Sequence, residues 1–237
     1  MLIGITGGIG SGKSVIARQL RQMGYGVYDT DSEAKRIIME DAHVRAQITA
    51  LFGSQAYKDG VYQTAFVAQQ VFNANSPSPN SSSPNSPSPN SLIASSPNSL
   101  IAPSPNPLLA RLNAIVHPAV KADIGNWVSE LSDSPKGDPT SDSEAIRQHS
   151  DLLFIECAIL YQAGIDALCD KVVAVTAPED IRLSRVIARD RSDIDKVRAR
   201  MRAQSTEEDL RRADIVIHND GTTPIPQLCE ELLQSIK

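Results

Sequence analysis

Five short apolar runs, rich in β-branched residues, punctuate the chain and are bounded by glycine, proline or charged residues. Runs of this length and composition are typical of buried β-strands. The sequence therefore predicts strands over residues 2–6, 26–29, 152–156, 172–176 and 215–218.

Stretches with helical periodicity separate several of these runs. The segment from Thr176 to Glu179 has the form of a capping box with a proline near the first helical position, which predicts the start of a helix. Helices are predicted over 13–23, 179–189 and 194–202, and two more begin after Ser205 and Pro224. Strands that alternate with helices favour an α/β fold, with helices on both faces of a mostly parallel sheet.

The long region between the second and third predicted strands has a helical pattern and is too long for a simple crossover. Helices are predicted over 42–52, 64–72 and 118–131, which indicates an accessory helical domain. Within it, residues 75–107 hold nine of the fifteen prolines and repeat short Ser/Pro/Asn motifs, so we expect a disordered, solvated insertion. Residues 132–150 predict a second flexible loop for the same compositional reason.

Composition excludes several classes of protein. With 237 residues, 41% of them hydrophobic, the chain can bury the core of one domain, and its net charge of −5 argues against a general nucleic-acid coat. No apolar stretch approaches the roughly 20 residues that span a bilayer and no cleavable leader is visible, so we expect a cytoplasmic protein without membrane or nucleic-acid partners. Cys157, Cys169 and Cys229 form no CxxC pair and are expected to be free thiols.

The first predicted strand runs into the sequence GGIGSGKS, residues 7–14, which matches the pattern G-x-x-x-x-G-K-[ST] between a strand and a helix. In this motif backbone amides turn inward around a phosphate, the lysine reaches the β- and γ-phosphates, and the hydroxyl can bind Mg²⁺. A simple glycine-rich turn would leave Lys13 and Ser14 unexplained. The sequence thus predicts a P-loop for a nucleoside triphosphate, with contacts from Gly8, Ile9, Gly10, Ser11, Gly12, Lys13 and Ser14, the last also a metal ligand.

Two aspartates, Asp29 and Asp31, stand at the end of the second predicted strand. In a parallel sheet this end lies on the same edge as the phosphate loop, where ligands bind. Residues two apart in an extended segment point to one side, so one carboxylate could help to hold a metal while the other accepts the proton of an attacking hydroxyl. Either aspartate could instead cap the next helix.

Basic residues cluster between Arg182 and Arg212. Arg185 and Arg189 lie one helical turn apart, and residues 190–193 interrupt the helix before a second basic one. An arginine-rich helix-break-helix fits a mobile lid that closes over a polyphosphate and excludes water. Arg189, at the helix end, is the arginine expected to act there, whereas most other charges in such a run face solvent.

Together these segments resemble the dephospho-coenzyme A kinase family. The motifs that carry the resemblance occur in order: ITGGIGSGKS at 5–14, DTDSEAKR at 29–36, His-Pro at 117–118, RARMRAQS at 198–205 and ADIVIHNDG at 213–221. The match covers nearly all of the chain outside the two low-complexity segments.

The resemblance implies an α/β fold: a P-loop kinase core with a parallel five-stranded sheet flanked by helices, an inserted helical substrate domain and a helical lid. The core would comprise residues 1–35, 151–188 and 206–237, the coenzyme A domain 36–131 and the lid 189–205. It also implies an activity, the ATP-dependent phosphorylation of the 3'-hydroxyl of dephospho-coenzyme A, with Mg²⁺, in a monomer or weak oligomer.

The resemblance further implies roles for individual residues. Asp31 is similar to the family's proposed base, Lys13 and Ser14 to its phosphate and metal ligands, and Arg189 to its lid arginine. Asn219 and Gly221 lie where the ATP base is approached. Substrate contacts are expected at Asp29, Lys35, His117 and Gln204. For His117 a packed histidine that holds a helix start is the other interpretation, and Lys121 one turn later favours substrate contact.

The chain departs from the family pattern at several positions. After the third predicted strand, Ala158 replaces a usual proline and Gln162 a usual glutamate, which leaves a hydrogen-bonding group without charge. Thr64 stands where the family often has arginine, and His218 replaces a common aspartate. Lys35 stands near a usual arginine or histidine, which keeps the charge and loses the planar fork.

Two other functions stay open at this point. A different P-loop small-molecule kinase, such as a nucleoside monophosphate kinase, would share the loop, the lid and the aspartate. A nucleotide-dependent switch or binding protein would need no phosphate acceptor, although the chain lacks the D-x-x-G and N-K-x-D motifs associated with GTPases. Release of ADP with dephospho-coenzyme A, with AMP and without an acceptor distinguishes the three.

Overall fold

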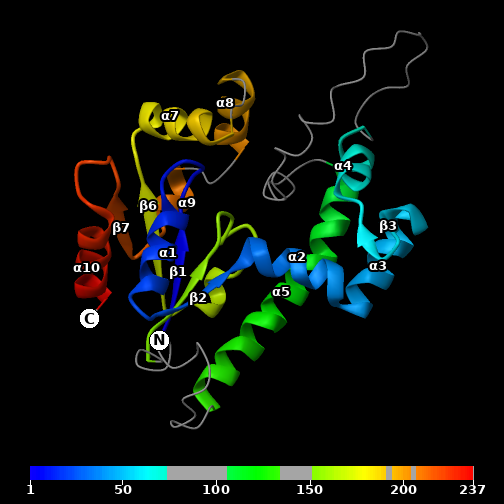
Figure 1. Cartoon of the computed structure of the whole chain (residues 1–237), viewed down its shortest axis with the longest axis horizontal. Coiled ribbons are helices and arrows are strands. Elements are labelled where there is room, and N and C mark those ends of the chain that lie inside the picture. The colour runs from blue at the N-terminus through cyan, green and yellow to red at the C-terminus, as the bar shows by residue number, and fades with distance from the viewer. Residues whose placement is uncertain (74–105, 134–150, 191–193, 204–206, 237) are drawn as a thin grey trace. The chain divides into compact units, whose positions relative to one another are not determined.

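The computed structural model describes residues 1–73, 106–133, 151–190, 194–203 and 207–236 (Figure 1). The chain divides into two compact units, a larger one of Met1–Thr30 with Asp123–Lys237 and a smaller one of Asp31–Ala122. Among the helices of these described residues, none combines the length and the apolar character needed to cross a membrane.

The larger unit is built on a five-stranded sheet in which all neighbouring strands are parallel, in the order β2-β5-β1-β6-β7. The strands are β1 (Leu2–Thr6), β2 (Gly26–Asp29), β5 (Leu153–Glu156), β6 (Lys171–Thr176) and β7 (Ile215–His218). This confirms the predicted parallel five-stranded sheet, with two strands that begin one residue away from the expected start.

Two helices, α1 (Lys13–Gln22) and α10 (Ile225–Ile236), pack side by side on one face of this sheet (Figure 1). Their apolar residues recur at helical spacing, so a single stripe of each helix faces the strands. The core consists of Ile3, Ile5, Phe154, Val173, Val175 and Ile217 of the strands, Ile16 and Leu20 of α1, and Leu228, Cys229, Leu232 and Ile236 of α10. Burial of each large side chain contributes about 1.5–3 kcal/mol.

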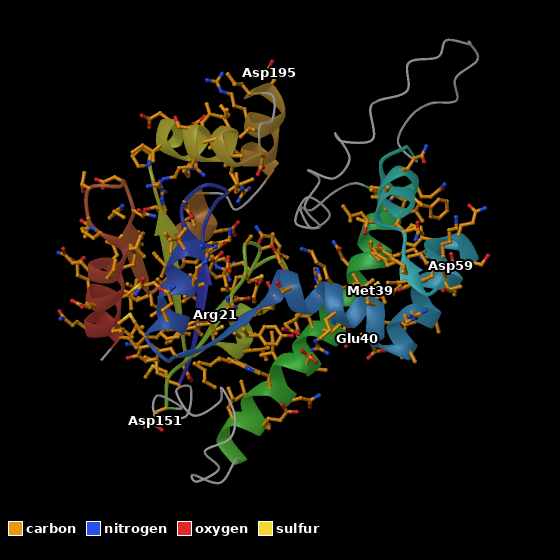
Figure 2. All side chains as sticks on the ribbon, viewed as in Figure 1. Arg21, Met39, Glu40, Asp59, Asp151 and Asp195 are labelled. Carbon is orange, nitrogen blue, oxygen red and sulfur yellow. The ribbon has the colours of Figure 1, made fainter. Side chains whose placement is uncertain are left out.

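The other face of the sheet is contacted by the last part of α5 (Pro107–Asp133). Side chains alternate along β2, so Val27 packs against the core described above and Tyr28 points the opposite way. The Tyr28 hydroxyl donates to Oδ2 of Asp123 over 2.6 Å, and its ring lies 5.4 Å from the ring of Trp127. At the α1 side, Arg21, labelled in Figure 2, donates from Nε and Nη2 to the carbonyl of Val27.

Three helices lie between β6 and β7 in the chain: α7 (Glu179–Asp190), α8 (Ile194–Ala203) and α9 (Glu207–Arg211). Helix α7 starts just beyond the carboxyl end of β6, as the capping-box sequence predicts (Figure 1). The three cysteines are free thiols, as expected, and burial raises the pKa of Cys169 to about 12.

The smaller unit is mainly helical. It contains most of α2 (Thr30–Glu40), then α3 (Ala42–Phe52), a short 3-10 helix (Ser54–Ala56), a hairpin of β3 (Tyr57–Lys58) and β4 (Val61–Tyr62), α4 (Thr64–Asn73) and the first part of α5. The Asp41 carboxylate caps α3 by accepting from the Val44 amide over 2.8 Å. In the hairpin turn Asp59, labelled in Figure 2, and Gly60 both have positive φ, which Asp-Gly turns favour.

Helix α5 differs from its predicted range, 118–131, because it begins at Pro107. The Asn106 side chain accepts from the amides of Leu108 and Leu109, and Pro107 occupies a position where a proline costs no hydrogen bond. Pro118 therefore lies inside the helix. Its apolar stripe continues across that proline, with Leu109, Leu112, Val116, Val120 and Ile124 buried.

The expected insertion at 75–107 and the expected loop at 132–150 lie outside the described residues, except for residues 106–107 and 132–133, which belong to α5 and its cap. The expected helix-break-helix is present as α7 and α8, with the break at 191–193 outside the described residues.

Candidate functional site

The glycine loop, residues 7–12, connects β1 to α1. Gly10 and Gly12 have φ values of 80° and 97°, a left-handed conformation that other residues adopt at a cost of about 1–2 kcal/mol. The amides of Val15 and Ile16 already bond to the carbonyl of Gly12, so α1 begins directly at the end of the loop. The first, unpaired amides of this helix and its positive dipole end thus lie beside the loop, an arrangement that binds anions.

Neighbouring backbone approaches the loop closely. A Cβ atom on Gly10 would lie 2.5 Å from the carbonyl oxygen of Arg182 on α7, and one on Gly7 would overlap the carbonyl of Val175 on β6. The Ser11 side chain is fully buried, and its hydroxyl has no hydrogen-bond partner among the described residues. Buried hydroxyls are normally satisfied, so the unpartnered Ser11 hydroxyl is an exception within the loop.

Ser14 and Glu156 form a direct link between the loop and the neighbouring strand. The Ser14 hydroxyl donates to Oε1 of Glu156 over 2.6 Å, and the Glu156 residue is only 8% exposed at the carboxyl end of β5. Hydroxyl and carboxylate oxygens are the ligands that Mg²⁺ prefers. No group of three or more His, Cys, Asp or Glu side chains suited to a metal occurs among the described residues, so a Mg²⁺ ion here would depend on substrate phosphates and water for its other ligands.

Sequence reasoning did not select Glu156 as a site residue. Its signal was its place as the last residue of the predicted strand at 152–156, at the sheet edge where ligands bind. Asp29 lies beside Glu156 at the same sheet edge, because the two residues are opposite each other in the pairing of β2 with β5.

The two aspartates lie in different backbone environments. Asp29 ends β2, whereas Asp31 lies in the first turn of α2, which begins at Thr30. The expectation that both lie in one extended segment and point to one side is therefore wrong, because the helix starts between them. The Thr30 hydroxyl donates to the carbonyl of Glu156 over 2.9 Å and fixes the point where β2 passes into α2.

Asn219, directly after β7, contacts the glycine loop. Its side-chain amide donates to the carbonyl of Ser11 over 2.9 Å, and its own amide donates to the carbonyl of Thr176. Arg185 of α7 connects the same elements: Nη1 donates to the carbonyl of Asn219 over 3.0 Å and, at longer range, to those of Gly10 and Ser11. The structure thus brings Asn219 to the loop, and it shows Arg185 as a link that sequence reasoning assigned only to a basic helix face.

Gly221 lies two residues further along, with a φ of 92° and the guanidinium of Arg185 3.4 Å from the position of a Cβ atom. His218 stays close to the sheet, because its Nδ1 lies 2.9 Å from the hydroxyl of Thr176.

Two site residues were expected in the lid, Arg189 and Gln204. Arg189 is exposed at the end of α7 and forms a two-pronged pair with the carboxylate of its neighbour Asp190, at 2.6 and 3.2 Å. This hydrogen bond raises the pKa of Arg189. Gln204 lies outside the described residues.

Lys35 and His117 belong to the smaller unit, Lys35 exposed on α2 and His117 half-buried in α5. His117 does not hold a helix start, since it lies ten residues after the first residue of α5. Its Nε2 is buried without a partner among the described residues. Burial, with a smaller effect from Lys121, lowers the pKa of His117, so the imidazole is neutral near pH 7.

Ala158 and Gln162, which differ from the family pattern, both have defined surroundings in the structure. Ala158 is buried, and the side-chain amide of Gln162 donates to the carboxylate of Asp209 on α9 over 3.0 Å. A glutamate at 162 would meet Asp209 as a like charge, so this pair requires the neutral side chain.

The chain was compared with known families and proteins. The family model described as dephospho-CoA kinase matches residues 1–80 and 105–224. A dephospho-CoA kinase of Porphyromonas gingivalis is 36% identical over 89% of this chain and 81% of that protein, and one of Salinibacter ruber is 35% identical over 93% and 89%.

Two solved structures share the fold. The structure of TT1252 from Thermus thermophilus has a TM-score of 0.66 and 28% identity, and covers 100% of this chain and 95% of that one. A dephospho-CoA kinase from Campylobacter jejuni has a TM-score of 0.58 and 21% identity over 99% and 96% of the two chains.

Proposed function

The chain belongs to the dephospho-CoA kinase family, and we propose that it transfers the terminal phosphoryl group of ATP to the 3'-hydroxyl of dephospho-CoA, giving CoA and ADP. The observation that carries this proposal is the family match on both sides of residues 81–104, which includes the glycine loop and its contacts with Asn219. The transfer needs little covalent work from a protein, so binding, alignment and charge stabilisation are what the residues supply.

The glycine loop holds the triphosphate. Its inward-turned amides and the N-terminus of α1 bind phosphate oxygens, and Lys13 neutralises the β- and γ-phosphates. Ile9 and Gly8 contribute backbone to the same loop, and the buried Ser11 hydroxyl gains a partner in a phosphate oxygen. Asn219, which bonds to the loop at Ser11 and accepts from Arg185, is proposed to approach the base of ATP together with Gly221.

Ser14 and Glu156 form the proposed Mg²⁺ site. The 2.6 Å hydrogen bond between them supports this site, because the two oxygens lie close enough together to bind one ion. A Mg²⁺ ion held by these two residues would offset the negative charge that develops on the phosphate oxygens.

Asp31 is the proposed base. As the 3'-hydroxyl oxygen bonds to the γ-phosphorus, the bond from that phosphorus to the β,γ-bridging oxygen breaks and ADP leaves, while the Asp31 carboxylate accepts the hydroxyl proton. Its position beside Thr30, which is anchored on Glu156, supports this role.

Arg189 is proposed to exchange its pairing with Asp190 for a contact with the transferred phosphoryl group when ATP is bound. Asp29, Lys35, His117 and Gln204 are the proposed substrate contacts. His117 supports this role in one respect: its buried Nε2 has no partner among the described residues, so a substrate hydroxyl or phosphate oxygen would satisfy it.

The test is ADP release by the purified full chain with dephospho-CoA, with AMP or with no acceptor, together with the mass of the product. We expect release only with dephospho-CoA and a product heavier by one phosphoryl group. Stimulation by AMP alone would assign the chain to another kinase reaction, and equal release without acceptor would contradict the transfer altogether.

A further inference from the structure

Arg182, near the start of α7, lies directly against the glycine loop. Its carbonyl oxygen occupies the space that a Cβ atom on Gly10 would need, and its Nη1 lies where a Cβ atom on Gly8 would stand. Both the backbone and the guanidinium of Arg182 therefore contact the loop, and at Gly10, where the neighbour is backbone, the contact requires glycine.

Within the described part of the chain, no acidic side chain pairs with the guanidinium of Arg182. Its Nε is buried without a hydrogen-bond partner among the same residues. The other two arginines of α7 are satisfied: Arg185 donates to carbonyls of the loop and of Asn219, and Arg189 pairs with Asp190. A cation that is partly buried without a partner is costly unless an anion meets it.

We infer that Arg182 contacts the phosphate chain of bound ATP as an additional phosphate-binding residue beside Lys13. The inference rests on the proposed function, because it takes ATP as the anion held by the loop. A guanidinium offers a planar fork of N–H donors that matches phosphate oxygens. Nη1 of Arg182 lies against Gly8 of the loop, and Nε of the same guanidinium has no partner among the described residues.

The experiment measures binding of ATP by calorimetry, without acceptor, to the wild type, R182Q, R182K and R18Q. Arg18 is exposed on α1, so R18Q removes the same charge from the larger unit away from the loop contact. Because R182Q loses a hydrogen-bonded charge, we expect its Kd for ATP to rise roughly tenfold or more. The Kd of R182K is expected to lie between those of R182Q and the wild type.

Salt dependence separates a phosphate contact from a merely structural role. If Arg182 binds phosphate, the Kd of R182Q for ATP rises less steeply with KCl than that of the wild type, while R18Q follows the wild type. An ATP affinity of R182Q equal to that of R18Q, or a parallel salt dependence, overturns the inference. The result is independent of turnover: absence of activity with dephospho-CoA in the wild type would contradict the proposed function, whereas the comparison of ATP binding would still decide the role of Arg182.

Discussion

The hydroxyl of Ser14 and the buried carboxylate of Glu156 share a hydrogen bond of 2.6 Å, although 142 residues separate them in the chain. This contact joins the first turn of α1 to the end of the neighbouring strand β5. It brings together the two oxygen atoms of the proposed Mg²⁺ site beside the glycine loop, and it identifies a partner for Ser14 that the motif alone does not name.

Replacement of Glu156 by glutamine tests that metal site. Because the amide keeps the size and a hydrogen bond to Ser14 but loses the charge, we expect the Mg²⁺ concentration for half-maximal rate to rise about 10- to 100-fold, with the fold intact. The measurement is turnover against MgCl₂ concentration, with E230Q on the exposed side of α10 as the matched control. Identical Mg²⁺ curves for E156Q and E230Q would remove Glu156 from the metal site.

The variant D31N tests the proposed base. We expect turnover to fall at least roughly a hundredfold while the Kd values for ATP and dephospho-CoA change little, because the amide cannot accept the proton but retains the size of the side chain. Single-turnover rates and calorimetry measure the two effects. D59N, in the exposed hairpin turn where asparagine also tolerates positive φ, is the control. Turnover by D31N close to that of D59N would show that Asp31 does not remove the proton.

The variant G10A tests the close packing of the glycine loop. A methyl group at a φ of 80° and 2.5 Å from the carbonyl of Arg182 must displace the loop, so we expect a loss of about 1–3 kcal/mol in unfolding free energy and ATP affinity lowered at least tenfold. Urea unfolding and ATP titration measure these effects.

Gly53 offers a matched control for that substitution. Its φ of 82° is almost the same, but no atom lies within 4 Å of the position of its Cβ. G53A therefore carries the backbone cost without the collision, and we expect its ATP affinity to equal that of the wild type. Equal ATP affinities for G10A and G53A would contradict the role assigned to the contact with Arg182.

His117 makes stability depend on pH. Because burial lowers its pKa in the folded protein, the unfolded chain binds more protons below about pH 6.5, the ordinary histidine pKa. Stability contributed by the neutral imidazole is present above that pH and is lost as the pH falls toward the folded pKa. We expect the unfolding free energy to decrease less between pH 7.5 and 5.5 in H117Q than in the wild type. Parallel losses would show that His117 does not titrate on unfolding.

Local patterns were sufficient for the sheet and the loop. Short apolar runs predict the strands, and the spacing of the glycines predicts the phosphate-binding loop. Both signals are contained within a few residues. The order of the five strands could not be read in the same way, because pairing depends on contacts between distant segments.

The missed features have identifiable physical causes. The sequence predicts a helix from Pro118, whereas α5 begins at Pro107, because the apolar stripe from Leu109 to Ile124 continues through the proline. The prediction that Asp29 and Asp31 lie in one extended segment was wrong because α2 begins between them, at Thr30. The sequence places Glu156 at a strand end and Arg182 in a basic cluster, but it does not show that either lies against the glycine loop, because that depends on which distant segments meet in space.

The adjacency of β2 and β5 has a consequence for how such a chain can change. The polypeptide between β2 and β5 leaves one strand and returns to the strand beside it. Both of its ends are fixed by the pairing of these strands, from Gly26 with Leu153 to Asp29 with Glu156. The amount of polypeptide between them is not set, and each doubling of a flexible stretch costs only about 0.6 kcal/mol. The polypeptide between β2 and β5 can therefore become longer or shorter in evolution without a change in the sheet of the larger unit.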